Sequence, residues 1–439
     1  MHDISSLDLD LRSHQLDNGL RVVLHPDHRL PLVAVNLWYH VGSKNERRGR
    51  TGFAHLFEHM LFQGSENVGT NDHFRYVQQA GGVCNGSTWY DRTNYYQTLP
   101  AHYLDLGLWL EADRMGFLLP AMTQAKLDTQ REVVMNERRQ RVDNQPYGRA
   151  GERLMELTYP EGHPYHHPVI GYMDDIAAAT LDDVAAFFRT YYAPNNAVLT
   201  LAGDFEPDDA LERVERWFGD VPRGPEVPPV SVAEATPGGE ARDLLPDDVH
   251  LPRVYMAYRV PAIGEPLWYA ADVFSTALAT GRASLLYEDL VYRRQLAQDV
   301  AAYLYPTEVS GTLYLAATAR PEVDPADLEQ AITDHVEHHA VELLSDERIE
   351  RARRMLLNEL FLEAQKLDGR ADLLSQFTTL FDDPRRLAGE AERVAAVSAE
   401  QVRELAAVHC RRDRRAVVTV VPRDAAPGNG APGNGGAPS

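Results

Sequence analysis

The chain has 439 residues, of which 65 are acidic and 43 are basic, so its formal net charge is −22. An acidic chain without a long basic cluster is not expected to have nucleic acid or an anionic membrane as its main partner. Its two cysteines, Cys84 and Cys410, exclude a disulfide framework and a cysteine-based metal cluster. No basic and apolar leader opens the chain, and no run of 18 apolar residues occurs, so we expect a cytoplasmic protein.

The first half of the chain alternates between strand-like and helix-like segments. Residues 20–26 and 32–41 are rich in β-branched and aromatic side chains and are bounded by turn residues, which predicts two strands. Periodic apolar residues then predict helices, interrupted by further strands. In chain order, these elements are helices at 53–63 and 73–80, a strand region from 83 to 98, helices at 101–117 and 123–141, and a strand at 197–203.

The second half repeats this pattern. Residues 252–261 resemble the strand at 31–40, and residues 410–419 resemble residues 191–200 with an offset of 219 (416 − 197 for the aligned alanines). A period near half the chain predicts a duplicated domain. Helices are expected here at 265–279, 284–296, 324–344 and 346–366.

We therefore expect an α+β fold of two homologous domains, the first at 1–222 and the second at 247–422. The segment 223–246 is rich in Pro, Gly and Glu, which predicts an interdomain linker. The segment 423–439 repeats Pro, Gly and Asn and is expected to be a disordered tail.

The sharpest chemical signal is His55-x-x-Glu58-His59, inside a segment of helical periodicity. Histidines four residues apart lie on one helix face, so both imidazoles can bind a single metal ion. Glu58 lies beside that face, where a carboxylate can accept a proton from a metal-activated water. The pattern predicts a water-activating metal site.

The alternative interpretation is a histidine pair on a solvated helix face. This helix carries too much apolar bulk for that, including Phe53, Phe57 and Met60. Buried histidines beside a carboxylate need partners, which a metal ion supplies. The apolar content therefore favours the metal site.

The order His-x-x-Glu-His resembles the inverzincins, the pitrilysin/insulinase family of zinc metallopeptidases. The resemblance implies a glutamate on a second helix as third zinc ligand, and Glu137 lies at that position, 78 residues after His59 (137 − 59). Glu132 is the local competitor, but on a helix it points about 140° away from Glu137. Many family members carry a supporting glutamate seven residues before the ligand, where this chain has Gln130.

Residues 81–95 resemble the family's Asn-Ala-x-Thr-x-x-Asp-x-Thr-x-Tyr strand. In the family this is an edge strand onto which the peptide substrate adds as another strand. The resemblance therefore assigns substrate alignment to Asn85, Gly86 and Ser87, with Gly86 standing where alanine is usual. Without the resemblance, an ordinary sheet with a turn is the preferred interpretation of these residues.

Two other features are expected to be structural. Residues 163–167 contain three histidines, but Pro164 opposes a helix and no carboxylate lies at ligand spacing. Cys84 is interpreted as a small buried residue, because nothing beside it in the sequence would lower the pKa of its thiol.

The resemblance also implies an arginine and a tyrosine, seven residues apart, that stabilise the developing oxyanion. Val291 and Gln298 stand at those positions, whereas Arg293 and Arg294 are out of phase. Family members of this length form two-chain clamshells, and in some of them one chain brings the zinc and the other brings the arginine and tyrosine. The resemblance thus implies the zinc-bearing subunit of a heterodimer, with a homodimer that uses Arg293 or Arg294 as the alternative.

The residues and the resemblance together predict a zinc endopeptidase that cleaves short or unfolded peptides, with one Zn²⁺ per chain. His55, His59 and Glu137 are the expected ligands, and Glu58 is the expected general base and later proton donor. The implied fold is that of the mitochondrial processing peptidases, in which each domain is a mostly antiparallel sheet packed with helices. The alternative is a non-catalytic peptide-binding or structural subunit of the same fold, although such subunits usually lose ligands that are all present here.

Overall fold

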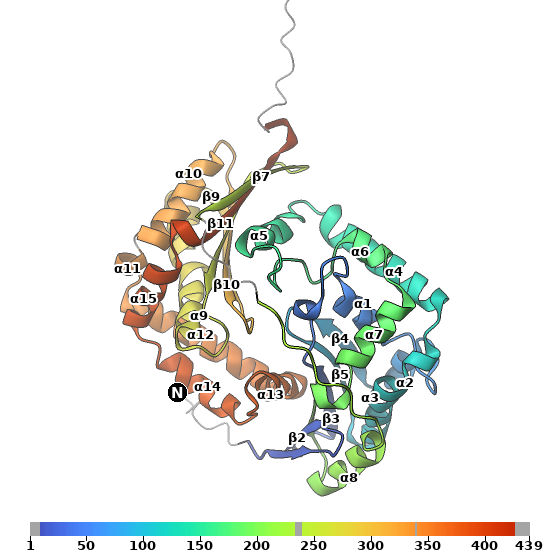
Figure 1. Ribbon diagram of the computed structural model, residues 1–439. Coiled ribbons are helices and arrows are strands. Elements are labelled where there is room, and N and C mark those ends of the chain that lie inside the picture. Colours follow the sequence, from blue (N-terminus) through green and yellow to red (C-terminus); the bar gives the residue numbers. More distant parts are fainter. Residues whose placement is uncertain (1–8, 233–238, 339, 426–439) are drawn as a thin grey trace, which may run out of the picture.

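In the computed structural model, which describes residues 9–232, 239–338 and 340–425, the chain forms two β-sheets covered by helices (Figure 1). The first sheet has the order β1-β2-β6-β3-β5-β4. Its strands are β1 (Arg12–Gln15), β2 (Arg21–Pro26), β3 (Leu32–Tyr39), β4 (Val83–Thr88), β5 (Thr93–Pro100) and β6 (Ala197–Gly203).

The second sheet has the order β7-β11-β8-β10-β9. Its strands are β7 (Ala241–Asp247), β8 (Arg253–Val260), β9 (Ala297–Tyr305), β10 (Gly311–Ala319) and β11 (Arg415–Pro422). If β1 is left aside, the strands β2, β6, β3, β5 and β4 of the first sheet correspond in order to β7, β11, β8, β10 and β9 of the second. Each sheet contains one parallel pair, β2 with β6 and β7 with β11. The other pairs are antiparallel. This shared topology confirms the predicted duplication, and β6 and β11 are the strands that the sequence offset aligns.

Helices fill the remainder of both halves. Those of the first half are α1 (Phe53–Met60), α2 (Asp72–Gln79), α3 (Leu104–Phe117), α4 (Gln124–Arg138), α5 (Ala150–Thr158), α6 (Met173–Ala177), α7 (Leu181–Tyr191) and α8 (Pro207–Phe218). Those of the second half are α9 (Pro266–Ala279), α10 (Pro325–Thr333), α11 (Ala340–Leu343), α12 (Asp346–Gln365), α13 (Leu367–Phe381), α14 (Arg386–Ala395) and α15 (Ala399–His409). The α+β fold of helix-packed, mostly antiparallel sheets is therefore confirmed.

The two halves exchange helices. Helix α13 of the second half lies on β3 and β6 of the first sheet, where Leu374 and Phe377 pack against Trp38 and Val198. In return, α5 of the first half lies on β8 and β11 of the second sheet. Because both faces of each sheet are then covered, the central strands are buried on both sides, and β6 has no exposed residue.

The structure also differs from the expected elements. Residues 241–247, at the end of the predicted linker, form β7, because they pair with β11 and complete the second sheet. The helix expected at 284–296 is shorter, a π-helical segment from Tyr287 to Arg293, and β9 begins at Ala297. Of the predicted tail, residues 423–425 form a short 3-10 turn, and residues 426–439 lie outside the described part of the chain.

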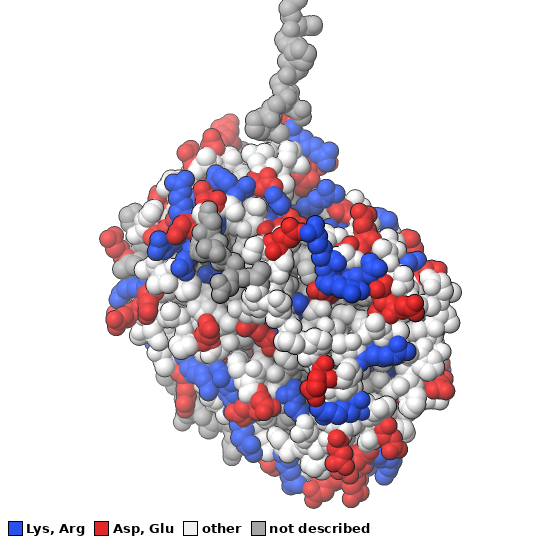
Figure 2. All heavy atoms as spheres, viewed as in Figure 1, with Lys and Arg blue, Asp and Glu red and all other residues white. Residues whose placement is uncertain are grey.

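Charged side chains of both signs are interspersed over the face seen in Figure 2, and several acidic groups lie close together at its lower end. None of the helices within the described residues is long and apolar enough to cross a membrane.

Candidate metal centre and catalytic site

The helix that carries the His-x-x-Glu-His motif, α1, begins at a buried acidic cap. The fully buried carboxylate of Glu46 accepts hydrogen bonds from the backbone N–H groups of Gly52 (2.8 Å) and Ala54 (2.7 Å). The two carboxylate oxygens thereby satisfy two of the backbone donors that the first turn of a helix leaves unpaired. Gly52 has a φ of +83°, and a Cβ there would lie 2.6 Å from the carbonyl oxygen of Ile170, so the turn into α1 requires glycine.

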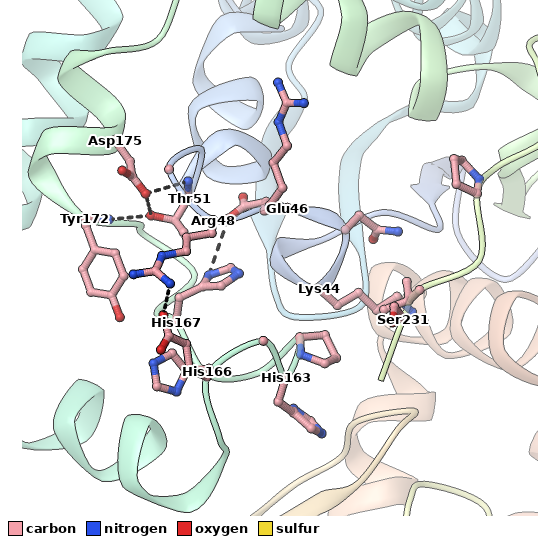
Figure 3. A pocket seen from close by; sticks show the side chains of 18 of the residues that line it. Lys44, Glu46, Arg48, Thr51, His163, His166, His167, Tyr172, Asp175 and Ser231 are labelled. Atoms are coloured by element: carbon pink, nitrogen blue, oxygen red, sulfur yellow. Dashed lines mark hydrogen bonds and ion pairs between the residues drawn. The ribbon is translucent and has the colours of Figure 1, made fainter. Parts of the chain in front are cut away.

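Long-range contacts fix this end of α1 further. Asp175 accepts hydrogen bonds from the backbone N–H and the hydroxyl of Thr51, and His167 lies 3.6 Å from Glu46. These side chains line one end of a cavity of about 880 Å³ (Figure 3). These contacts hold the N-terminal end of α1, whereas His59 lies near its C-terminal end, so they position the motif without belonging to it.

The three predicted ligands meet between α1 and α4. Oε2 of Glu137 lies 3.3 Å from Nε2 of His59 and 3.8 Å from Nε2 of His55. The two imidazole rings have centroids 4.9 Å apart. One donor atom from each of the three residues lies within 4.8 Å of the others, and all three side chains are largely buried.

The rest of α4 distinguishes the acidic candidates. Glu132 is exposed, so the structure does not bring this competitor to the histidines. Gln130 is buried at 6% exposure, two turns before Glu137 on the same helix. Arg141, which sequence reasoning missed, pairs with Oε1 of Glu137 at 2.6 Å and leaves Oε2 toward the histidines. Its i,i+4 spacing from Glu137 was the available signal.

The electrostatics of the cluster favour metal binding. Burial and the neighbouring His59 lower the pKa of His55 to about 4, so its imidazole is neutral and has a free lone pair at neutral pH. The pKa of the Glu137 carboxyl is also lowered, chiefly by its hydrogen bond with His59. Both groups therefore stay in the protonation state that a metal ion requires.

The donor set fits zinc. Ligand atoms at zinc–nitrogen and zinc–oxygen distances on a tetrahedral ion lie roughly 3.3 Å apart. The 3.3 and 3.8 Å separations around Glu137 are close to that value. Two imidazoles and one carboxylate leave one coordination position open, as catalytic zinc sites do. One feature departs from the usual pattern, since Nδ1 of His55 is buried without a hydrogen-bond partner in the described residues.

Glu58 lies beside this cluster and is held by the first sheet. Its Oε2 accepts a hydrogen bond of 2.7 Å from the hydroxyl of Thr88, the last residue of β4. Burial raises the pKa of the Glu58 carboxyl, and the Thr88 hydrogen bond opposes that rise. A carboxylate with a raised pKa is a better proton acceptor near neutral pH. Thr88 was not predicted as a site residue, although it follows Gly86 by two and therefore shares its face of the strand.

Strand β4 is an edge strand, as the resemblance implied. It pairs with β5 on one side and with no strand of the described chain on the other. A Cβ on Gly86 would lie 3.2 Å from Cγ of Glu58 and equally close to Phe62 and Tyr95. The missing side chain therefore lets β4 approach the catalytic candidate closely.

The other two predicted substrate residues have their side chains on the opposite face of β4, because side chains alternate along a strand. The Ser87 hydroxyl donates to Asn94 (2.7 Å) and contacts Arg92. The Asn85 carboxamide accepts a hydrogen bond from the backbone N–H of Gly86 (2.9 Å). A peptide could therefore pair with the backbone N–H and C=O groups of these residues, rather than with their side chains.

The second half of the chain supports this strand. Asp372 of α13 accepts hydrogen bonds from Asn94 (2.8 Å), Trp38 (2.7 Å) and Asn36 (3.1 Å). Asn94 in turn accepts the hydrogen bond from Ser87. A continuous chain of hydrogen bonds therefore connects α13, which belongs to the second half, with β4.

The positions implied for the arginine and tyrosine carry neither. Val291 is buried in the π-helical segment 287–293, and Gln298 is exposed near the start of β9. Arg293 and Arg294 are exposed and pair with Glu288 and Asp289. The structure brings none of them into the metal cluster.

The remaining histidine group, at residues 163–167, makes contacts within the protein, and its structural role stays a prediction. Nδ1 of His163 accepts a hydrogen bond from the backbone N–H of Tyr165, and His166 contacts the carbonyl oxygen of Tyr159. Within the described ranges, no group of three potential ligands other than His55, His59 and Glu137 has metal-binding geometry. Burial raises the pKa of the Cys84 thiol to about 11, which agrees with an unreactive cysteine.

Comparisons with known proteins agree with this geometry. The family model described as "Insulinase (Peptidase family M16)" matches residues 21–170, and the one described as "Peptidase M16 inactive domain" matches residues 178–356. The chain is 31% identical over 371 residues to "Zinc protease PqqE" of Helicobacter pylori, covering 84% of this chain and 80% of that protein. It is 24% identical over 413 residues to "Probable mitochondrial-processing peptidase subunit beta, mitochondrial" of Arabidopsis thaliana, covering 90% and 76%. The crystal structure of a protease from Helicobacter pylori has a TM-score of 0.88 at 27% identity and covers 94% of this chain and 100% of that one.

Proposed function

The chain belongs to the insulinase family of peptidases, family M16, and we propose that it is a zinc-dependent endopeptidase that cleaves short or unfolded peptides. The observation that carries the proposal is the convergence of His55, His59 and Glu137 beside the partly buried carboxylate of Glu58. Relatives that are named zinc proteases support the choice of metal.

His55, His59 and Glu137 would hold one Zn²⁺ ion, which would supply Lewis-acid activation of a water molecule and of the substrate carbonyl. Glu58 accepts a proton from the attacking water and later delivers it to the leaving amine. Thr88 keeps the Glu58 carboxylate in place through its hydrogen bond. Gln130, buried on the face of α4 that carries Glu137, is proposed to support that helix without adding charge.

The peptide is proposed to add to the free edge of β4 along Asn85, Gly86 and Ser87. Pairing through main-chain hydrogen bonds depends little on the side chains of the substrate, so it suits peptides of varied sequence. The edge ends at Thr88, which holds Glu58, and this brings an added strand past the catalytic carboxylate.

We further propose that the chain works with a homologous partner chain that supplies the arginine and tyrosine. The side chain of Val291 has no hydrogen-bond donor and that of Gln298 carries no charge, and the relative from Arabidopsis thaliana is itself named a subunit. A non-catalytic subunit is the second candidate, supported by the description of the matched C-terminal family model as an inactive domain. The cytoplasmic location stays a prediction.

The partner is tested by affinity purification of the tagged chain from its native source. We expect a homologous chain without the His-x-x-Glu-His motif to co-purify, and the pair to cleave an unfolded fluorogenic peptide about a hundredfold faster than this chain alone, because one oxyanion donor contributes about that factor. Equal rates with and without the second chain would contradict the heterodimer. If this chain alone were fully active, and the Arg293→Gln variant were inactive, the homodimer would replace the heterodimer as the proposed assembly.

A further inference from the structure

The hairpin that joins β9 and β10 in the second half contacts the first half of the chain. The backbone N–H of Glu308 donates a hydrogen bond to Oδ2 of Asp91 (3.0 Å), and that of Val309 donates to the Tyr165 hydroxyl (3.0 Å). The Tyr165 hydroxyl in turn donates to Oδ1 of Asp91 (2.7 Å). Asp91 lies in the turn between β4 and β5, so the tip of this hairpin is bound directly to the end of the proposed substrate strand.

Charged side chains meet at the same contact. The Lys44 ammonium lies 3.3 Å from Oδ1 of Asp91 and also contacts Oε2 of Glu308. Oε1 of Glu308 lies 2.7 Å from Nε2 of His40. The side chains of Lys44 and Asp91 are each 6% exposed, and that of Glu308 is 21% exposed. We call Lys44, Asp91 and Glu308 the Lys44 cluster, in which Glu308 is the member from the second half.

The members of the Lys44 cluster depend on one another. Burial lowers the pKa of the Lys44 ammonium, and the Asp91 carboxylate opposes that shift. Burial raises the pKa of the Asp91 carboxyl, and Lys44 opposes that rise. A buried charge that loses its partner is strongly destabilising. Loss of one member is therefore expected to displace the others rather than to leave them in place.

The Lys44 cluster adjoins both contacts that place Glu58. Asp91 lies three residues after Thr88, whose hydroxyl binds the Glu58 carboxylate. Lys44 lies two residues before Glu46, whose carboxylate caps the start of α1. The two segments are also paired directly, because the backbone N–H of Lys44 donates to the carbonyl oxygen of the residue before Asp91 (2.9 Å). A displaced cluster would therefore move the Thr88 end of β4 and the start of α1.

The rest of the substrate strand is held separately. The Ser87 hydroxyl is bound to Asn94, and Asn94 is bound to Asp372 of α13. Loss of the Lys44 cluster should therefore leave the main chain of residues 85–87 in place while it moves Thr88. The placement of Glu58 should change more than the binding of a peptide to the edge.

We propose that the Lys44 cluster positions Glu58 for peptide hydrolysis, so that Glu308 of the second half contributes to catalysis in the first half of the same chain. Its three members are positioning residues and not catalytic ones, because they act through Thr88 and the start of α1. The proposal rests on the proposed peptidase activity, and it adds a role for the second half that is separate from any residue supplied by a partner chain.

The test measures hydrolysis of an unfolded fluorogenic peptide by Asp91→Asn and Glu308→Gln, each purified as the unmodified chain is. In Asp91→Asn the amide nitrogen cannot accept a hydrogen bond, so a buried donor loses its acceptor. Glu308→Gln removes the charge that pairs with Lys44. We expect kcat to fall about tenfold or more in both variants, because a small misplacement of a reacting group can lower a rate about a hundredfold. KM should stay within about twofold, and the zinc content should be unchanged.

Asp243→Asn is the matched control. Asp243 of β7 pairs with Arg153 of α5 at 2.6 Å, so this substitution also removes an ion pair between the two halves. That pair lies where α5 covers the second sheet. We expect the kcat and KM of the unmodified chain. A similar loss of kcat in Asp243→Asn and Asp91→Asn would overturn the proposal, because any weakened contact between the halves would then have the same effect.

Thermal melting establishes that each variant is folded. Unchanged kcat in folded Asp91→Asn and Glu308→Gln, or a rise in KM without a fall in kcat, would also overturn the proposal. If Asp91→Asn does not fold, Glu308→Gln decides, since its hairpin keeps the backbone bond to Asp91. An unmodified chain without zinc-dependent hydrolysis would contradict the proposed function itself, and the positioning role would fall with it. An active unmodified chain with equally active variants would contradict the positioning role alone.

Discussion

Replacing Glu58 by glutamine is expected to lower the kcat/KM of peptide hydrolysis about a thousandfold, while the bound zinc remains. Glutamine has nearly the same shape and can still accept the hydrogen bond from Thr88, but it cannot take a proton from water. Such a loss corresponds to about 4 kcal/mol of transition-state stabilisation. The measurement is peptide cleavage by the chain with its partner, together with the zinc content of each preparation.

The matched control is Glu66→Gln, an exposed glutamate in the loop after α1. It should leave both rate and zinc content unchanged. A Glu58→Gln chain that kept its zinc and still cleaved at the original rate would exclude Glu58 as general base.

Replacing Glu137 by glutamine is expected to weaken zinc binding about a hundredfold or more. The carboxylate lies within 3.8 Å of both histidine Nε2 atoms, and the change to an amide removes the negative charge of the donor set. Its charge also balances the metal, and the lowered pKa of its carboxyl keeps it ionised. Competition with a zinc chelator of known affinity measures the loss.

Glu132→Gln provides the control for this prediction on the same helix. Glu132 has the same side chain as Glu137 but is exposed, so the zinc affinity of the Glu132→Gln variant should equal that of the unmodified chain. A loss in Glu132→Gln, or similar affinities in both variants, would show that α4 presents a different face to the histidines.

The part of the site that lies on α1 could be predicted from the sequence, because its residues lie within one short helical segment. His55 and His59 are held on one face by helical periodicity alone, and that geometry is observed. Glu137 lies on another helix, and only the family resemblance selected it over Glu132. Thr88 was within reach of the same reasoning, since strand alternation places it on the face of Gly86.

The supporting contacts could not be predicted because they depend on tertiary packing. Glu46 and Asp175 fix the start of α1 from segments that no periodicity connects with it. Asp372 reaches the first sheet only because α13 crosses to the other half. A contiguous division at residue 222 or 247 does not describe that exchange of helices.

The sheet edges show the same limit. Residues 241–247 have the Pro and acidic content of a linker, yet they form β7 because β11 offers an unpaired edge. Ser87 was assigned to substrate binding from the family's strand motif, without regard to the face of β4 on which its side chain lies. In the structure that side chain donates a hydrogen bond to Asn94.

The central claim is that zinc at His55, His59 and Glu137 is required for peptide cleavage. The most direct measurement is to remove the metal from the chain with a chelator, add its partner, and titrate zinc back while following hydrolysis of an unfolded peptide. We expect no cleavage without metal and full activity at one zinc per chain, with no recovery on adding magnesium, which disfavours imidazole ligands. Hydrolysis that persists in the metal-free chain, or that zinc does not restore, would contradict the account.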